Sequence, residues 1–408
     1  MSLWHPFTQM RGFAPIGEVV EARGAWLTLA DGRRLFDGIS SWWVTLHGHS
    51  HPRIVQAIAE QAARFDQVIL ADFTHRPAAE LARRLAARMP GDLDHVFFSD
   101  DGSTAVEVAL KMAWQGQRAQ DPRRDTLVAM RGAYHGDTLG AMSVTERDVF
   151  SQPFNPLLVD VVFLEWRADA IQSWFQEHGH RAVACIAEPL VQGAQGMRFH
   201  DPALLRTLAE ACQGAGAWLI ADEVMTGFGR LGTLLACERA GVSPELVCLS
   251  KGITGGALAL GATVCTDAVY RRFLGDRKLD AFLHGHSYTG NPIACATALA
   301  SLALFEEEQT LARVAALEAR YAAQAPALAA LPGVTNLRFM GSILAFEVEG
   351  GPGGYFDPAG ARVCDAALAR GLFLRPLGNT VYLLPPLCTT PDELGWCLDV
   401  LAAAIQEA

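Results

Sequence analysis

The sequence predicts an α/β protein, with a mainly parallel central sheet in a large domain and a smaller α+β domain. The first observation is a series of short apolar runs that polar residues do not interrupt, separated by amphipathic stretches. Strands of this kind are buried on both faces, which is typical of parallel sheets covered by helices. The second observation is the length, because 408 residues are enough for a large domain with a smaller one beside it.

The strands of the large sheet are expected between about residues 96 and 266. Ligands bind such sheets at the carboxyl ends of the strands. Gly102 with Ser103, Asp222 and Lys251 follow strand ends, so we expect them to share one site. The predicted strands are His95–Ser99, Leu127–Met130, Val161–Leu164, Ala182–Ala187, Ala217–Ala221, Leu246–Leu249 and Gly261–Thr266.

The pattern changes after Asn291-Pro292, where two Ala-rich helices are expected, from about Ile293 to Phe305 and then up to about Leu331. We predict a division into residues 1–50, an N-terminal segment that joins the small domain, 51–290, the large ligand-binding domain, and 291–408, the small α+β domain. The small domain is expected to contain the segments Ser342–Val348, Ala359–Arg370, Leu372–Arg375 and Val381–Leu384.

Composition excludes several classes of protein. The net charge of −11 offers no basic face to nucleic acid. We expect a cytoplasmic protein, since the first residues do not resemble a signal peptide and no run of eighteen apolar residues occurs. The nine cysteines are odd in number and lack C-x-x-C spacing, which predicts buried reduced thiols.

Lys251 and Asp222 each close an apolar run, and together they suit one cofactor. Pyridoxal phosphate needs an amine to hold it as a Schiff base and a carboxylate to keep its pyridine nitrogen protonated. Lys251 is followed by Gly252, Gly255 and Gly256, which leaves little room for an ordinary surface charge. Taken singly, the two residues also fit a solvent-reaching lysine and a capping carboxylate, so only their combination is specific.

A place for the cofactor phosphate is predicted in the segment from Phe97 to Ala113. This segment passes from a strand through Gly102 into a helix. A helix start offers free backbone N–H groups and a favourable dipole to a phosphate, with the hydroxyls of Ser103 and Thr104 beside them. An ordinary helix N-cap is the alternative, and the strand-end position favours the phosphate.

Two other patterns resemble known sites but lack the expected surroundings. Gly227–Gly232 has the glycine spacing of a dinucleotide site, yet Asp222 and Glu223 just before it would repel a pyrophosphate. The histidine-rich segments His47–His51 and His284–His286 have no cysteine or carboxylate at ligand spacing, so we predict no metal site.

Four aromatic or basic residues suit a binding pocket. Tyr134 can lie flat on a conjugated ring, although a buried aromatic at a turn fits as well. Trp42 and Trp43 cannot both face inward on a strand, because neighbouring side chains alternate, so one should face a cavity, a partner or a ligand. Arg375 lies between two predicted strands, where it either grips a carboxylate or forms a salt bridge at the rim.

Taken together, these segments resemble the class III pyridoxal-phosphate-dependent aminotransferases of fold type I, from end to end of the chain. Three more specific segments, Trp4–Met10, Gly38–Trp43 and Arg375–Pro386, are similar to members of this class that act in biotin biosynthesis. The general resemblance is carried, in chain order, by Gly102-Ser103, Tyr134–Asp137, Glu188-Pro189, Asp222-Glu223, Lys251 and Gly290–Pro292.

The resemblance implies roles for the cofactor-binding residues. Lys251 would attach pyridoxal 5'-phosphate and shuttle the proton, Asp222 would pair with the pyridinium, and Tyr134 would stack on the ring. A homodimer with shared active sites is implied, because the phosphate would be bound by Gly102 and Ser103 together with His286 and Ser287 of the partner subunit.

The resemblance also implies a reaction, the transfer of the α-amine of S-adenosylmethionine to 8-amino-7-oxononanoate, giving 7,8-diaminononanoate. Arg375 would take the carboxylate of the ketone substrate. Another class III ω-aminotransferase, a lysine-using enzyme of the same pathway and a catalytically silent relative stay open as alternatives. The substrate pocket would comprise Phe7, Trp42, Tyr134, Lys251, Gly285, Arg375 and Tyr382.

The sequence departs from the family pattern at a few positions. Phe7 stands where the family usually has a tyrosine, which removes a hydroxyl that a polar substrate group would otherwise meet. His286-Ser287 replaces a more usual Pro-Thr and retains one hydroxyl. Ala194 and Met225 stand where ornithine- and γ-aminobutyrate-type relatives carry a glutamate and a glutamine, which favours the biotin-pathway members.

Overall fold

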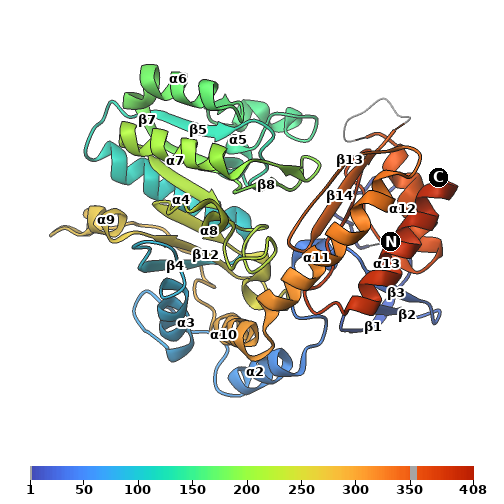
Figure 1. Ribbon diagram of the computed structural model, residues 1–408. Helices are drawn as coiled ribbons and strands as arrows, with labels where there is room; N and C mark the ends of the chain where they lie inside the picture. The colour runs from blue at the N-terminus through green and yellow to red at the C-terminus, as the bar shows by residue number, and fades with distance from the viewer. Residues whose placement is uncertain (1, 350–355) are drawn as a thin grey trace.

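The structure is a computed structural model that describes residues 2–349 and 356–408, and its largest element is a seven-stranded sheet (Figure 1). The strand order is β4-β12-β11-β10-β7-β5-β6, in which β12 is antiparallel to both neighbours and the other pairs are parallel. The predicted strands are confirmed to within one residue at their ends: β4 (His95–Ser99), β5 (Thr126–Met130), β6 (Val161–Leu164), β7 (Ala182–Ala187), β10 (Trp218–Asp222), β11 (Leu246–Leu249) and β12 (Gly261–Cys265).

Helices cover both faces of this sheet, because successive side chains of a strand point to opposite faces and both sets are apolar. In β10, Leu219 packs in one apolar cluster on the side of α7 (Pro202–Ala215), whereas Ile220 packs in a second cluster with α4 (Gly102–Arg118). Further helices add to these layers: α5 (Leu139–Val144) packs against α4, and α6 (Ala168–His178) and α8 (Ala236–Ala240) against α7.

A second sheet joins the two ends of the chain. Figure 1 shows its first strands, in blue, beside the red C-terminal helix α13 (Pro391–Glu407). Trp26, Phe36 and Trp396 pack their rings together there, and the indole N–H of Trp26 donates to Glu393 at 2.8 Å. The sheet consists of β1 (Val19–Arg23), β2 (Trp26–Leu29), β3 (Arg34–Asp37) and β15 (Leu372–Phe373), with β3 and β15 parallel.

The rest of the C-terminal third is built on a three-stranded sheet, as the α+β pattern indicates. Helix α11 (Thr310–Ala329) packs on β13 and α13, whereas α10 (Pro292–Glu307) packs on α2 (Pro52–Ala62) and α3 (Arg76–Ala86). The limits of the two domains stay a prediction. The elements of this sheet and its cover are β13 (Val334–Met340), β14 (Ile343–Val348), α12 (Ala359–Ala369) and β16 (Thr380–Leu383).

The prediction that treated Trp42 and Trp43 as strand residues is wrong. They end α1 (Ser40–Trp43), a turn in which Ser40, Ser41, Trp42 and Trp43 have φ angles of 51°, 46°, 68° and 73°. This backbone is left-handed and compact, so neighbouring side chains do not alternate between two faces as they do on a strand. Both tryptophans therefore contribute to one cavity.

The nine cysteines are free thiols, eight of them buried and Cys388 half-buried, which agrees with the prediction of buried reduced thiols. Within residues 2–349 and 356–408, no helix combines the length and apolarity needed to cross a membrane.

Candidate active site

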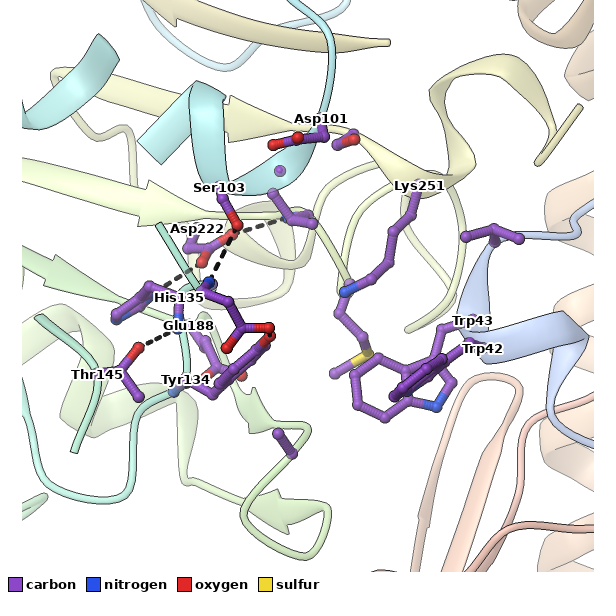
Figure 2. Close-up of a pocket in the computed structure, with 18 of the residues that line it drawn as sticks. Trp42, Trp43, Asp101, Ser103, Tyr134, His135, Thr145, Glu188, Asp222 and Lys251 are labelled. Carbon is purple, nitrogen blue, oxygen red and sulfur yellow. Dashed lines mark hydrogen bonds and ion pairs between the residues drawn. The ribbon is translucent and has the colours of Figure 1, made fainter. Parts of the chain in front are cut away.

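The carboxyl ends of the central strands open into a cavity of ≈ 530 Å³ (Figure 2). It brings together residues that lie far apart in the sequence and were predicted to form one site. The predicted residues that line it are Phe7, Trp42, Gly102, Ser103, Tyr134, Asp222 and Lys251.

Lys251 extends into this cavity. It is the second residue after β11 and the first residue of the 3₁₀ helix η3 (Lys251–Thr254). Its Nζ lies 4.8 Å from the ring centre of Trp43. Enclosure by protein lowers the pKa of this amine, although the charges of Asp222 and Glu188 act in the opposite direction. A lowered pKa frees a larger fraction of the amine as a nucleophile. Lys251 also has φ of 43°, a strained conformation that is common at active sites.

Asp222 ends β10, the strand next to β11, and its carboxylate is held on both oxygens. Oδ2 lies 2.6 Å from Nδ1 of His135, and Oδ1 accepts the backbone N–H of Val224 at 3.1 Å. The backbone N–H of His135 donates in turn to Thr145 Oγ1 at 2.9 Å. His135 therefore fixes the orientation of the carboxylate. Sequence reasoning gave His135 no role, although it lies within the Tyr134–Asp137 segment on which the family resemblance rested.

The start of helix α4 also lines the cavity, next to the end of β10. The Ser103 hydroxyl accepts the backbone N–H of Asp137 at 3.2 Å and lines the cavity. Gly102 packs so tightly that a Cβ atom there would lie 2.7 Å from Cγ1 of Val224. A residue with a side chain would push this helix start away from the end of β10.

The hydroxyl of Thr104 is not available to a phosphate as the sequence suggested. Asp101 accepts the backbone N–H of Thr104 at 2.7 Å, and Thr104 Oγ1 accepts the backbone N–H of Asp101 at 3.0 Å. These two bonds form a capping box, which satisfies N–H groups of the first helical turn. Thr104 thus stabilises the helix, and Ser103 is the hydroxyl that lines the cavity.

Glu188 joins two walls of the cavity. Its carboxylate accepts the backbone N–H groups of Tyr134 and Gly193, both at 2.8 Å. Burial raises the pKa of Glu188 to about 7, against a lowering by the nearby His135. The phenol of Tyr134 donates to Asp137 at 3.0 Å, and burial raises its pKa. These contacts hold the Tyr134 ring in place at the cavity wall.

Aromatic rings form the side of the cavity remote from the sheet. The Phe7 ring lies edge-on to Trp42, with 5.6 Å between ring centres, and to Phe150, at 6.1 Å. The guanidinium carbon of Arg375 lies 4.7 Å from the ring centre of Trp42. Arg375 does not line the cavity itself, so a carboxylate would reach it beyond Trp42.

Tyr382 is buried and also lies behind a tryptophan. Its hydroxyl accepts the indole N–H of Trp43 at 3.0 Å. Tyr382 is absent from the cavity lining, so it acts on the cavity through Trp43.

The segment Gly285–Ser287 does not line the cavity of its own chain. His286 Nε2 lies 3.7 Å from Oδ1 of Asp100, a residue that does line it, and the carbonyl of Ser287 accepts a hydrogen bond from Gln67 at 2.6 Å. The segment is therefore beside the cavity.

Several cavity residues had no signal in the sequence, because they lie outside the motifs that were recognised there. They are Met142 on α5 and the loop residues Asp148, Phe150, Ser151, Gln195 and Leu258. Leu377 also lines the cavity and lies within the segment Arg375–Pro386, but it was given no role of its own.

Comparisons with known proteins agree with this geometry. The family model described as "Aminotransferase class-III" matches residues 11–405. The chain belongs to the class III aminotransferases. It is 52% identical over 406 residues to an adenosylmethionine-8-amino-7-oxononanoate aminotransferase of Synechococcus elongatus, covering 96% of this chain and 95% of the relative.

Two solved structures of aminotransferases superpose on almost the whole chain. A protein with the same name as that relative, from Methanocaldococcus jannaschii, has a TM-score of 0.96 and 34% identity, with 100% of this chain and 97% of that chain covered. An amine transaminase from an uncultivated Pseudomonas species in the PLP-bound form has a TM-score of 0.92 and 31% identity, with 100% and 99% covered.

Class III aminotransferases depend on pyridoxal phosphate, and the residues of the cavity fit this cofactor. An amine with a lowered pKa and a braced carboxylate lie at the ends of neighbouring parallel strands, β11 and β10. The start of α4 lies in the same cavity, where its backbone N–H groups suit a phosphate. Among the described residues, no cluster of His, Cys, Asp or Glu side chains competes as a metal site.

Proposed function

We propose that this class III aminotransferase transfers the α-amine of S-adenosylmethionine to 8-amino-7-oxononanoate and so makes 7,8-diaminononanoate, a step of biotin biosynthesis. The observation that carries the proposal is the 52% identity, over almost all of both chains, to a relative named for this reaction. The cavity supports the proposal. The ketone substrate has an aliphatic chain that ends in a carboxylate, so it needs an apolar surface and a carboxylate-binding group, and Phe7, Trp42 and Arg375 could provide them.

The residues divide the work of the reaction between them. The bound cofactor supplies an electron sink for the negative charge that develops at the substrate carbon. The Lys251 amine would hold the cofactor aldehyde and would move the proton at the substrate carbon that bears nitrogen. Asp222, which is hydrogen-bonded to His135, would keep a positive charge on the pyridine nitrogen. Ser103 and the N–H groups at the start of α4 would hold the phosphate.

The aromatic side of the cavity would bind the substrates. The rings of Phe7, Trp42 and Phe150 provide an apolar surface for the aliphatic chain of 8-amino-7-oxononanoate. Arg375, beyond Trp42, would bind the terminal carboxylate of that chain. Asp148 also lines the cavity, and its negative charge favours the cationic amine or sulfonium of the substrates.

A homodimer with shared active sites is part of the proposal. Gly285–Ser287 lies beside the cavity without lining it, so His286 and Ser287 of the partner subunit would complete the phosphate site. Ile69, Phe73 and Tyr288 support this arrangement, since these large apolar side chains are exposed on two segments joined by the bond between Gln67 and Ser287. Light scattering during size-exclusion chromatography should give a mass near twice the chain mass of 44.0 kDa.

A cytoplasmic location is also proposed. The nine free thiols support it, because thiols stay reduced in the cytoplasm.

The donor is tested by separating the two half-reactions. The cofactor-loaded protein is incubated with S-adenosylmethionine or with lysine, and absorbance reports conversion of the cofactor to its amino form. We expect conversion by S-adenosylmethionine only, followed by recovery of the original spectrum on addition of 8-amino-7-oxononanoate. Conversion by lysine alone would show that lysine is the donor. This alternative is tested because Phe7 lacks the hydroxyl of the tyrosine that the family usually has at this position. Conversion by neither would contradict both.

A further inference from the structure

The turn that presents Trp42 and Trp43 has an unfavourable backbone. All of Ser40–Trp43 have positive φ, between 46° and 73°. Residues with a Cβ atom avoid this conformation because Cβ approaches the following carbonyl oxygen, and runs of such residues are rare. A strained segment of this kind persists only where the surrounding structure holds it.

Asp37, the last residue of β3, holds this turn with a fully buried carboxylate. Its Oδ1 accepts the backbone N–H of Ser41 at 2.9 Å, and its Oδ2 accepts the Ser41 hydroxyl at 2.7 Å. Oδ2 also lies 2.9 Å from Nε2 of His49. Burial raises the pKa of Asp37, but the hydrogen bonds from His49 and Ser41 outweigh this effect and lower the pKa overall. The carboxylate is therefore ionised and accepts all three bonds.

His49 belongs to the histidine-rich segment His47–His51, which the amino-transfer chemistry does not use. Its backbone is fixed by paired hydrogen bonds with Gly24, at 2.7 and 3.2 Å, beside the β1–β2 hairpin. The imidazole is consequently held against Asp37. His51 forms a separate pair with Glu308, at 2.9 Å, near the end of α10.

Further bonds tie the turn to the rest of the pocket wall. The Ser40 hydroxyl donates to the carbonyl of Leu384 at 2.8 Å. Arg230, fully buried, donates to the carbonyls of Trp43 at 3.0 Å and Thr45 at 2.9 Å. Ser41 is the residue of the turn whose backbone and side chain both depend on Asp37.

We propose that Asp37 and His49 are positioning residues for the substrate pocket, because the buried carboxylate–histidine pair holds the left-handed turn and so fixes the rings of Trp42 and Trp43. The pair acts through the tryptophans and does not touch the substrate. The inference rests on the proposed function in one respect, the assignment of Trp42 to the substrate pocket.

Asp37→Asn is the principal variant, since it keeps the size of the side chain and one acceptor oxygen but removes the charge that faces His49. Glu308→Gln is the matched control, because it alters a carboxylate paired with a histidine at the same distance of 2.9 Å, away from the turn. Ser41→Ala removes only the hydroxyl bond to Asp37. It is the milder second variant and takes the place of Asp37→Asn if that protein does not fold.

Half-reactions are measured with every amine that converts the wild-type protein. The loss of a bond to a charged group predicts that KM rises about tenfold in Asp37→Asn and about threefold in Ser41→Ala. The value of kcat should change less, because the tryptophans bind substrate equally in its ground and transition states. Glu308→Gln should keep the wild-type KM even if its melting temperature falls. A change in stability alone would therefore not reproduce the expected pattern.

A crystal structure of Asp37→Asn gives a readout that does not depend on activity. We expect Ser41 and Trp42 to leave the left-handed region and the 3.0 Å bond between Trp43 and Tyr382 to be lost. An unchanged turn, or a KM that rises equally in Glu308→Gln, would overturn the inference. Failure of the proposed function would appear separately, as a wild-type protein that does not convert S-adenosylmethionine, and the crystal structure would still test the turn.

Discussion

The two sides of the cavity are built in different ways. The side that carries Lys251 and Asp222 is built on neighbouring parallel strands of one sheet: Asp222 is the last residue of β10, and Lys251 follows the end of β11 by two residues, with φ of 43°. The side that carries Phe7 and Trp42, with Arg375 behind Trp42, is assembled from three segments at opposite ends of the chain, and one of them is a left-handed turn.

In the proposed function, this difference separates the residues that carry out the reaction from those that bind the substrate. The sheet fixes the groups that the amino transfer needs, because a strand end cannot move without disturbing a core buried on both faces. The aromatic side is held by single buried polar groups such as Asp37 and Arg230, so one substitution can move it. Variants on the sheet side should therefore lose rate, whereas variants on the aromatic side should lose affinity.

The largest effect is expected for Lys251→Ala. Without the amine no group in the cavity can hold the cofactor aldehyde or move the proton, so kcat should fall about 10⁴-fold. Both half-reactions are measured by stopped-flow absorbance, with the exposed Lys278→Ala as control. Full activity in the Lys251 variant would contradict the assignment of the reaction chemistry to the sheet side of the cavity.

The next effect is expected for Asp222→Asn. A neutral amide no longer favours a positive pyridine nitrogen, and kcat should fall about 10²- to 10³-fold with little change in KM. Glu223→Gln is the control, since this neighbouring carboxylate is buried away from the cavity and caps backbone N–H groups of residues 236 and 237. A rise in KM at unchanged kcat would place Asp222 on the recognition side.

Glu188 predicts a pH dependence of stability. Its pKa of about 7 in the folded protein is above the unfolded value of 4.5. Between these values the folded state binds more protons, so its contribution to stability is full below pH 4.5 and is lost as the pH rises through 7. Urea unfolding at pH 5 and 7.5 should show Glu188→Gln gaining about 2 kcal/mol relative to wild type as the pH rises. A constant difference would contradict the raised pKa.

Arg375→Ala tests whether this guanidinium binds the substrate carboxylate. Loss of a charged partner for the terminal carboxylate should raise the KM for 8-amino-7-oxononanoate roughly ten- to hundredfold, with kcat little changed. Arg370→Ala, on the exposed end of α12, should leave this KM unchanged. Steady-state kinetics with saturating donor distinguish the two outcomes, and a fall confined to kcat would show that Arg375 serves the chemistry instead.

The smallest expected effects distinguish the roles of the neighbouring hydroxyls of Ser103 and Thr104. Thr104→Val should lower the free energy of unfolding by about 1 kcal/mol, because it removes the hydroxyl that accepts the backbone N–H of Asp101 in the capping box, without changing cofactor affinity. Ser103→Ala should weaken cofactor binding and leave stability nearly unchanged. Urea unfolding of the apo-protein and a fluorescence titration with pyridoxal phosphate measure the two quantities. The reverse result would mean that the phosphate lies nearer Thr104.

Sequence reasoning succeeded where local pattern decides structure. Short continuous apolar runs bounded by turn residues are typical of strands buried on both faces, so the ends of β10 and β11, and with them Asp222 and Lys251, were located in advance. The start of α4 was located in the same way, through Gly102. The family resemblance then supplied the roles of these residues, and those roles stay predictions.

It failed where distant contacts decide structure. Strands β1–β3 and β13 were not predicted, because they are short or only partly buried and their hydrophobic alternation is weak. The left-handed turn at Trp42 and Trp43 was read as a strand, since its backbone depends on Asp37 and Arg230 rather than on its own sequence. In the proposed homodimer, His286 and Ser287 would reach the site of a second chain, and the pattern of one sequence does not show such a contact.

The pairing of β3 with β15 sets the order in which the enzyme can be completed during translation. Residues 34–37 leave the ribosome early, but their parallel neighbour, residues 372–373, is synthesised near the end. At about 5–20 residues per second the nascent chain waits many seconds for that strand. The strands of the central sheet, which all lie before residue 266, can pair before then, whereas the sheet that contains β3 is completed only after β15 has been synthesised.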